Sequence, residues 1–401
     1  MSTPTSGAAT KLAPNRLKFR AGENHNTEYR RRGSSTSEGW NSVSDEILDQ
    51  YAFTRMLSLE RKRTERSGRR FILLLMDWVA TPNGRMPANF AGFATGLSKS
   101  IRETDVVGWY EQESVFGIIF TEIGDGEINS IIGALESRVR RAFAAELTPD
   151  DATGARLSFH VYPEQGANGE GSYNVDLKLY PDQSPDADPK RVSRAIKRAV
   201  DIVGSFTGLL ILSPFLILIA IAIKVSSKGP VLFRQKRVGR HGVMFEFLKF
   251  RSMYVANDES VHKAYVTKFI SGAAEPAEAN GKTVFKIKND ARVTRIGRLL
   301  RRTSLDELPQ LLNVLRGEMS LVGPRPSVPY EVVCYRLWHK QRLLKVKPGI
   351  TGMWQVGGRS RVKFDDMVRL DLQYAEHWSV WLDLMILLKT PAAVLTGEGA
   401  Y

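Results

Sequence analysis

Two adjacent carboxylates, Asp306 and Glu307, are the side chains of this sequence best suited to chemistry. They lie in SLDELPQLLNVLRG, where the apolar spacing predicts a helix that starts close to Asp306, because Pro309 is tolerated only in a first turn. Ser304 and Glu307 have the spacing of a capping box. Free amides and the helix dipole stabilise anions at such a helix start, so the position suits both an ionised carboxylate and a bound phosphate.

Arginines accompany this acid pair, with Arg301 before it and Arg325 after it in a GPRP turn. A guanidinium group binds phosphate through two parallel hydrogen bonds. Carboxylates combined with phosphates offer the oxygen ligands that Mg²⁺ prefers, which makes Asp306 the candidate metal ligand. An isolated Asp-Glu pair is usually only a favourable first turn, and isolated arginines are usually solvated. Their combination favours a phosphate site.

An uncharged apolar run, residues 202–223, is long enough for a membrane helix. Ser213 and Pro214 lie in its middle, where proline predicts a kink or a break. Basic residues flank the run on both sides, and such residues normally mark the cytoplasmic side. We therefore expect a re-entrant helix-break-helix that enters one leaflet and returns, with both ends in the cytoplasm. A kinked span is the competing interpretation, and a buried core helix is a third.

The composition is consistent with an anionic partner. Lys and Arg total 57 against 43 acidic residues, a formal net charge of +14. Such an excess indicates nucleic acid, an anionic membrane or a phosphorylated substrate, and composition alone does not separate these. The single cysteine, Cys334, excludes an intrachain disulfide and a cysteine metal cluster. With 401 residues, the chain is expected to form two domains with tails.

Changes in composition divide the chain into four parts. Residues 1–43 predict a disordered basic tail without a signal peptide. Residues 44–163 alternate between helical and strand patterns in a way that suits a small α/β domain with a mainly antiparallel sheet. Residues 164–189 form a linker rich in Gly, Asn, Asp, Ser and Pro. Residues 190–401 hold the apolar run and the acid pair, and we expect a membrane-associated α/β catalytic domain there.

The second half of the chain, from about residue 197 to 401, resembles the bacterial sugar transferase family, the monotopic phosphoglycosyl transferases. The matching strings are KRAVDIVGS, LSPF, GPVLFRQKRVG, KFRSM, SLDELPQLLNVLRGEMSLVGPRP, KPGITGMWQVGGR and LDLMILLKTPAAVLTGEGAY. SLDELPQ followed by SLVGPRP is nearly sufficient by itself. The closing strings resemble the branch that initiates exopolysaccharide or O-antigen assembly on undecaprenyl phosphate.

This resemblance implies a two-step reaction at the inner face of the bacterial cytoplasmic membrane. Asp306 would attack the β-phosphate of a UDP-sugar and release UMP, and undecaprenyl phosphate would then take the phosphosugar from the carboxylate. Glu307 would orient the phosphates or act as a base. Mg²⁺, Arg251, Arg301 and Arg325 would neutralise the developing charge. The sugar is not readable from the sequence, and glucose-1-phosphate or galactose-1-phosphate is an expectation at the level of the family.

Two further stretches carry weaker signals. In KPGITGMWQVGGR, Gln355 and Arg359 are candidates for contacting nucleotide or phosphate, and a purely structural turn is an equal alternative. The segment WSVWLDLMILLKTP is too short to span a bilayer. Its tryptophans predict a position on the membrane surface, with a buried core helix as the equal alternative.

The sequence around residues 45–163 resembles nucleotide-cyclase-like domains that carry a GGDEF hairpin. The hairpin position reads YEQES, which lacks the paired glycines that admit a nucleotide. Asp77 matches one metal ligand, but no second carboxylate follows it. We interpret this part as a degenerate copy with a regulatory or dimerisation role, and the sequence leaves homodimerisation open.

Two other functions compete with the transferase. A catalytically inactive membrane scaffold or regulator of polysaccharide synthesis would not need the acid pair and its arginines. A nucleic-acid-binding protein would leave the apolar run unexplained, and the sequence has no helix-turn-helix or aromatic-basic strand pattern. We therefore expect no nucleic-acid partner.

Overall fold

The computed structural model describes residues 47–78, 86–164, 175–183, 190–254, 260–274, 277–279, 282–284, 292–358 and 361–395. The tail expected at residues 1–43 lies outside this range, as does most of the linker expected at residues 164–189. The predicted site residue Arg359 lies outside it too.

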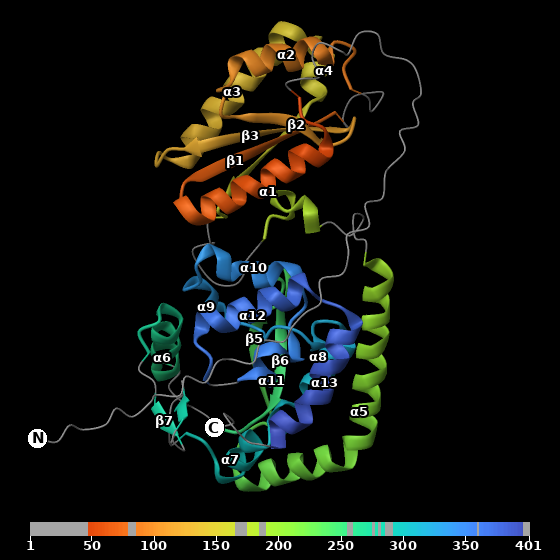
Figure 1. Ribbon diagram of the computed structural model, residues 1–401, viewed down its shortest axis with the longest axis vertical. Helices are drawn as coiled ribbons and strands as arrows, with labels where there is room; N and C mark the ends of the chain where they lie inside the picture. Colours follow the sequence, from red (N-terminus) through yellow and green to blue (C-terminus); the bar gives the residue numbers. More distant parts are fainter. Residues whose placement is uncertain are drawn as a thin grey trace, which may run out of the picture. The chain divides into compact units, whose positions relative to one another are not determined.

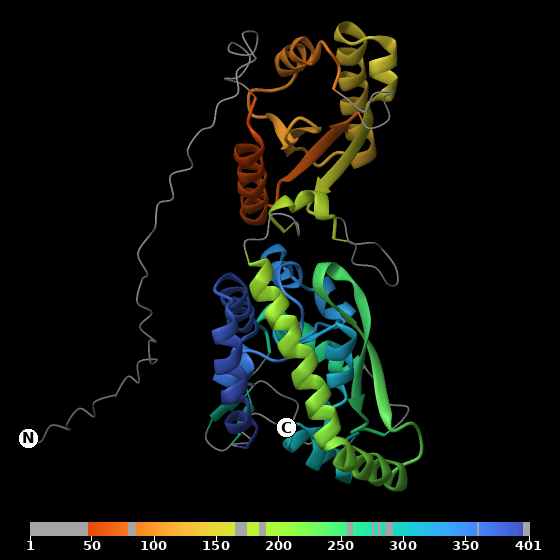
Figure 2. The same cartoon turned by 90° about the vertical axis from the view of Figure 1, so that its right-hand side faces the viewer.

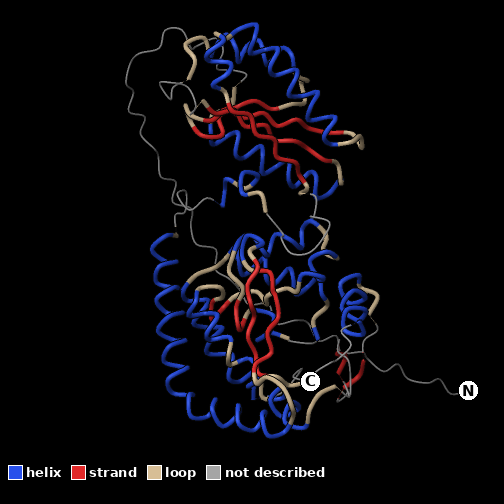
Figure 3. The backbone as a smooth tube through the Cα atoms, turned by 180° about the vertical axis from the view of Figure 1, so that it is seen from behind, coloured by secondary structure: helices blue, strands red, loops and turns tan. Residues whose placement is uncertain are grey.

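The N-terminal part contains a four-stranded sheet with helices on both faces (Figures 1 and 3). The strand order is β2-β3-β1-β4, and all three strand pairs are antiparallel, which confirms the predicted sheet type. Its elements are α1 (Gln50–Ser67), β1 (Arg70–Asp77), α2 (Phe90–Ser100), β2 (Val106–Glu111), β3 (Val115–Ile123), α3 (Ile128–Glu146), α4 (Pro149–Gly154) and β4 (Arg156–Tyr162). Two short 3₁₀ turns follow, η1 (Leu177–Leu179) and η2 (Pro181–Gln183).

Apolar side chains of the strands and helices pack together on both faces of this sheet. Strand β1, RFILLLMD, is central and is buried on both faces, as expected for a nearly continuous apolar run. Trp78 packs edge-on against Phe90 and Phe93, and Phe90 also contacts Phe116 of β3. Helices α2 and α3 thereby cover one face of the sheet, while α1 lies on the other (Figure 1).

The C-terminal part is mostly helical, and its described residues form three two-stranded sheets, β5-β6, β7-β8 and β9-β10 (Figure 2). Its first elements are α5 (Arg191–Ser226), β5 (Leu232–Val238), η4 (Arg240–Gly242), β6 (Met244–Phe250), α6 (Ser260–Ser271), β7 (Ala277–Ala279) and β8 (Lys282–Val284). The acid pair follows in η5 (Leu305–Glu307), which lies between α7 (Arg295–Arg302) and α8 (Gln310–Arg316). The remaining elements are β9 (Ser320–Val322), α9 (Pro329–Val333), α10 (Leu337–Lys345), β10 (Gly349–Thr351), α11 (Met353–Gly357), α12 (Phe364–Glu376) and α13 (Val380–Leu395).

The apolar run forms one helix that bends without breaking. Helix α5 is continuous over 36 residues with Pro214 inside it, and Figures 1 and 2 show its two arms meeting at a sharp bend. The expected helix-break-helix was therefore wrong in one respect, since no non-helical residue separates the arms. Pro214 cannot donate to the Leu210 carbonyl, but the Ser213 hydroxyl does so at 2.8 Å. This replacement bond satisfies the carbonyl that proline leaves without its usual partner.

Polar contacts that the sequence of α5 does not predict anchor the first arm of this helix. Asp201 is buried within the helix and accepts hydrogen bonds from the Ser320 hydroxyl (3.0 Å) and the Leu321 amide (2.9 Å). Arg198 donates to the carbonyls of Val314 and Leu315 at the end of α8. These bonds hold α5 against the elements that surround the acid pair.

The other side of α5 is apolar and exposed. Its exposed side chains include Val203, Phe206, Leu210, Ile211, Ile217, Leu218 and Ile221. By length and composition the helix could cross a membrane, and only 11% of its most apolar window is buried. A helix that packed in a soluble core would be buried on more of its faces, so the core-helix interpretation is wrong.

Candidate functional site

Asp306 lies in a 3₁₀ turn rather than at a capped α-helix start. Turn η5 precedes α8, and Pro309 adopts helical angles (φ −60°, ψ −17°) immediately before the first residue of that helix. Ser304 has left-handed angles (φ 56°, ψ 18°), and its side chain makes no capping bond. The expected capping box is therefore wrong. Ser304 instead makes a tight left-handed turn in the backbone directly before the 3₁₀ turn that holds Asp306.

Basic side chains surround the buried Asp306 carboxylate. Asp306 is 7% exposed, and burial together with the Glu307 charge raises its pKa from the ordinary value of 3.8. Lys249, Arg301 and Arg325 act in the opposite direction and favour the ionised form. Burial and the surrounding cations thus act on the pKa of this carboxylate in opposite directions, and carboxylates perturbed in this way are common at functional sites.

Glu307 differs from its neighbour in exposure and partner. Its carboxylate lies 3.4 Å from the Arg325 guanidinium, and the Arg325 side chain is about half exposed. Because this pair is solvent-accessible, it contributes little to stability.

The structure brings Arg301 and Arg251 to the same strand end by different contacts. Arg301 donates from Nε to the Ser252 hydroxyl at 2.9 Å. Arg251 is buried, and its Nη2 donates to the Ser227 carbonyl (2.7 Å) and hydroxyl (2.8 Å) at the end of α5. The Nε and Nη1 atoms of Arg251 have no hydrogen-bond partner among the described residues. Arg251 thus connects the end of β6 to the end of α5 through Nη2 alone.

Lys249 and Arg237 are functional candidates that reasoning from the sequence missed. They lie on the hairpin of β5 and β6, and both act electrostatically on the site. Burial lowers the pKa of Lys249 to about 8, with Asp306 opposing that shift and nearby arginines adding to it. Burial and the Arg325 charge lower the pKa of Arg237 to about 10. The signal for Lys249 was its position in a strand of apolar residues, where a lysine is costly unless it has a partner.

The KPGITGMW segment reaches the site through its backbone. Strands β9 and β10 pair in parallel, and the Gly349 amide donates to the Pro324 carbonyl at 2.8 Å. This pairing holds the GPRP turn that carries Arg325. The Gln355 amide nitrogen instead bonds the Ile350 carbonyl (3.2 Å), which favours the structural alternative for this side chain.

Helix α13 combines both alternatives considered for its segment. Trp378 and Asp383 are buried, and the Trp378 indole donates to the Asp383 carboxylate at 3.1 Å. Lys197 of α5 also bonds Asp383, at 2.6 Å. Trp381 and Leu388 are exposed on the other side of the helix. One face of α13 therefore packs on α5 and α12, and the opposite face is apolar and unpartnered among the described residues.

The acid pair alone is an incomplete metal site. Among the described residues, no group of three or more His, Cys, Asp or Glu side chains could hold a metal ion. Mg²⁺ is usually bound by one or two carboxylates and completes its shell with phosphate oxygens and water. Asp306, with Glu307 beside it, fits that donor set when a substrate phosphate is present.

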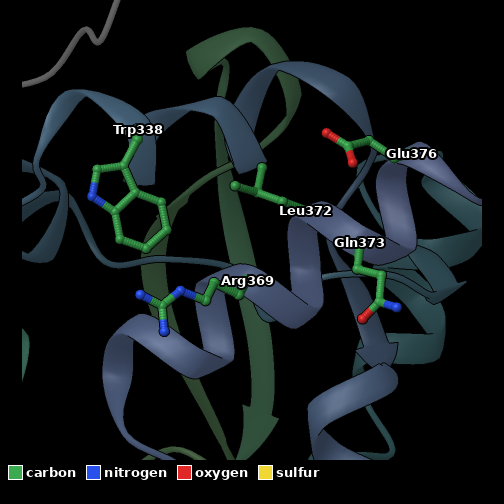
Figure 4. A pocket seen from close by; sticks show the side chains of 5 residues that line it. All are labelled: Trp338, Arg369, Leu372, Gln373 and Glu376. Carbon is green, nitrogen blue, oxygen red and sulfur yellow. The ribbon is translucent and has the colours of Figure 1, made fainter. Parts of the chain in front are cut away.

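A surface hollow of about 410 Å³ lies away from these residues (Figure 4). Trp338 of α10 faces Arg369, Leu372, Gln373 and Glu376 of α12 across it. It is wide open, and none of the predicted site residues lines it. We assign it no role in the chemistry.

Comparisons with known proteins identify the family of the second half of the chain. Residues 192–397 match the family described as bacterial sugar transferase. Over 213 residues the chain is 46% identical to the undecaprenyl-phosphate galactose phosphotransferase of Salmonella typhimurium, covering 53% of this chain and 43% of that protein. Over 205 residues it is 40% identical to the exopolysaccharide production protein ExoY of Rhizobium meliloti, covering 51% of this chain and 88% of that protein. The match thus spans less than half the length of the Salmonella relative.

Solved structures add little. A DGC protein from Thermotoga maritima is 16% identical, covering 31% of this chain and 87% of that one, with a TM-score of 0.25. That likeness carries no argument, so the degenerate GGDEF-like domain stays a prediction. The family match is different in extent, because it runs over more than half of the sequence and includes the acid pair. The chain therefore belongs to the bacterial sugar transferase family.

Proposed function

We propose that this protein is a phosphoglycosyl transferase that moves a sugar-1-phosphate from a UDP-sugar to undecaprenyl phosphate and so starts a membrane-bound glycan such as an exopolysaccharide. The observation that carries the proposal is the buried Asp306 carboxylate among Lys249, Arg301 and Arg325. A single carboxylate nucleophile surrounded by cations suits the transfer of a phosphoryl group. The names of the Salmonella and Rhizobium relatives support the acceptor and the pathway class.

The reaction would proceed in two displacements at one phosphorus atom. A carboxylate oxygen of Asp306 attacks the β-phosphorus of the UDP-sugar, and the bond from that phosphorus to the bridging oxygen breaks. UMP leaves with the bridging oxygen, and the phosphosugar stays on Asp306 as an acyl phosphate. A phosphate oxygen of undecaprenyl phosphate then attacks the same phosphorus and breaks the acyl phosphate bond. The products are undecaprenyl diphosphosugar and the original carboxylate.

Several side chains would support these steps. Lys249, Arg301 and Arg325 would bind the phosphate oxygens and stabilise the charge that develops on them. Glu307 would hold Arg325 until substrate arrives and then orient the phosphates. Asp306 and Glu307, with the substrate phosphates, would hold Mg²⁺, which would neutralise charge on the diphosphate when bound.

Release of UMP tests the proposal directly. Purified protein in nanodiscs is incubated with Mg²⁺, undecaprenyl phosphate and a panel of UDP-sugars that includes UDP-glucose and UDP-galactose. UMP release from one sugar would establish the reaction and identify the donor. If folded protein released no UMP with any sugar, the alternative function, an inactive scaffold or regulator of polysaccharide synthesis, would be favoured.

The pH dependence of UMP release should report Asp306 and Lys249. Asp306 attacks only when it is ionised, and its pKa is raised. As the pH is lowered, activity should therefore be lost at a higher pH than is usual for an aspartate. Lys249 loses its proton near pH 8, so activity should fall again on the alkaline side. In Lys249→Met the acid limb should move to higher pH, because the charge that favours ionised Asp306 is gone. Lys249→Arg should extend the alkaline limb upward.

A matched control for this profile is Lys268→Met, since Lys268 is exposed on α6. Its profile should equal that of the unmodified protein. An acid limb that did not move in Lys249→Met would show that Lys249 does not act on the nucleophile.

Membrane topology can be tested at the two ends of α5. We propose that both ends lie on the cytoplasmic side of the inner membrane, because basic residues flank both ends and α5 bends sharply within its length. In a Cys334→Ser background, single cysteines are introduced as Val192→Cys and Lys228→Cys, both at exposed positions. A membrane-impermeant maleimide should label both in inside-out vesicles and neither in intact spheroplasts. Labelling of the two cysteines from opposite sides would instead show a spanning helix.

A further inference from the structure

Ser252 contacts helix α7 near its start, middle and end. Its carbonyl accepts from the Thr294 amide at 3.1 Å, where α7 begins. Its hydroxyl accepts from Arg301 Nε at 2.9 Å, where α7 ends. Between them Gly297 lies so close that a Cβ atom there would be 2.0 Å from the Ser252 carbonyl oxygen. Ser252 therefore sets both the position of α7 and the direction of the Arg301 side chain.

Ser252 is itself rigidly held. It is 2% exposed, and the chain on either side of it is bonded to other elements. The Arg251 amide donates to the Val231 carbonyl at 2.9 Å, and Arg251 Nη2 bonds Ser227 at the end of α5. On the other side, the Tyr254 amide donates to the Arg292 carbonyl at 3.0 Å. The hydroxyl is thus a fixed point, and a side chain that bonds it is fixed in turn.

Arginine needs such a fixed point to act on a phosphate. Its side chain is long and has many rotamers, so an unrestrained guanidinium would sample many directions. A hydrogen bond at Nε orients the guanidinium plane, and this orientation fixes the directions in which the two Nη atoms point. Hydrogen bonds that involve a charged group are among the stronger ones in proteins.

We propose that Ser252 is a positioning residue that fixes the Arg301 guanidinium beside the Asp306 carboxylate, ready for the phosphoryl group that is transferred. The inference rests on the proposed function, since it assigns Ser252 a task in that reaction. Ser252 touches neither substrate nor nucleophile in this account and acts only through Arg301. Its neighbour Arg251 bonds Ser227 at the end of α5. Contacts of Arg251, Ser252 and Arg301 therefore connect the end of α5 with the surroundings of Asp306.

A double-mutant cycle tests this role, using Ser252→Ala, Arg301→Gln and the double variant. Loss of one charged hydrogen bond should lower kcat for UMP release in Ser252→Ala by about ten- to a hundredfold. The KM for the UDP-sugar should change less than kcat, because Ser252 acts on the transferred phosphoryl group only through Arg301. In the Arg301→Gln background, Ser252→Ala should have no further effect.

Two further measurements separate this inference from other causes. Ser252→Cys keeps the size of the side chain but accepts hydrogen bonds poorly, so it should lose activity even if Ser252→Ala folds badly. Ser271→Ala is the control, because that exposed hydroxyl bonds only the Lys268 carbonyl of its own helix (3.0 Å) among the described contacts. Its kcat should be unchanged.

The outcomes for Ser252 and for the transferase are distinguishable. Additive effects of Ser252→Ala and Arg301→Gln, in protein that still releases UMP, would overturn the positioning role and leave the transferase intact. If no UDP-sugar yields UMP, binding of UDP measured by calorimetry in the same four proteins replaces kcat as the readout. The inference would still be supported if Ser252→Ala weakened UDP binding in the unmodified protein but had no effect on it in the Arg301→Gln background. Equal binding in all four proteins would overturn it.

Discussion

Replacing Asp306 by asparagine should abolish UMP release, with a loss of about a thousandfold or more. The amide has nearly the same shape as the carboxylate but cannot form the acyl phosphate on which the proposed reaction depends. UMP formation in a single turnover, with a UDP-sugar and no acceptor, is the appropriate measurement. The unmodified protein should release up to one UMP per molecule, and Asp306→Asn should release none.

The same variant should fold at least as well as the unmodified protein. The folded-state pKa of Asp306 is raised above its ordinary value, so at neutral pH the ionised carboxylate opposes folding. Asparagine removes that charge, and the melting temperature should be equal or higher. Glu307→Gln is the matched control, because it neutralises the neighbouring carboxylate without removing the nucleophile. If Asp306→Asn still released UMP, another nucleophile would have to be sought.

Placing a side chain at Gly349 should cause a large loss of stability. A Cβ atom there would lie 2.1 Å from the Gly323 amide nitrogen and 2.6 Å from the Gly323 Cα atom. Backbone atoms cannot move aside as a flexible side chain does, so β9 and β10 must separate. Gly349→Ala should therefore destabilise the protein by about 2–4 kcal/mol, measured by thermal or chemical unfolding in detergent.

Activity should fall together with stability in this variant, because Arg325 follows the Gly323 turn directly. Gly357→Ala is the matched control within the same segment, since a Cβ at Gly357 would meet no atom within 4 Å. Its unfolding and UMP release should equal those of the unmodified protein. Normal stability in Gly349→Ala would mean that the close approach of β9 and β10 is not required for the fold.

The exposed apolar surfaces and the basic residues have a distribution that suits the proposed position at a membrane. Helix α5 presents one apolar side, α13 presents Trp381 and Leu388, and basic residues lie at both ends of α5. Apolar area of this kind partitions into the acyl region, while Lys and Arg favour anionic headgroups. A polyprenyl phosphate keeps its chain in the bilayer, so a nucleophile close to the surface would meet its phosphate there.

The sequence by itself determined the local features of this protein. The apolar run, the central Pro214 and the acid pair are recognisable because helices and turns are set by residues a few positions apart. The antiparallel sheet of the N-terminal part was predictable for the same reason, since each strand carries its own pattern. Local rules failed at Ser304, where a left-handed turn replaced the expected cap.

Only the tertiary structure decided which distant groups surround Asp306. Lys249 and Ser252 belong to a different segment of the chain, and no spacing rule connects them with the acid pair. Packing of η5 and α7 against the end of β6 places them there, with Gly297 allowing the closest approach. Burial then sets the pKa values, because desolvation depends on every neighbour in space and not on neighbours in sequence. The sequence could name Asp306 as the candidate nucleophile, but the ionisation of its carboxylate is a property of the fold.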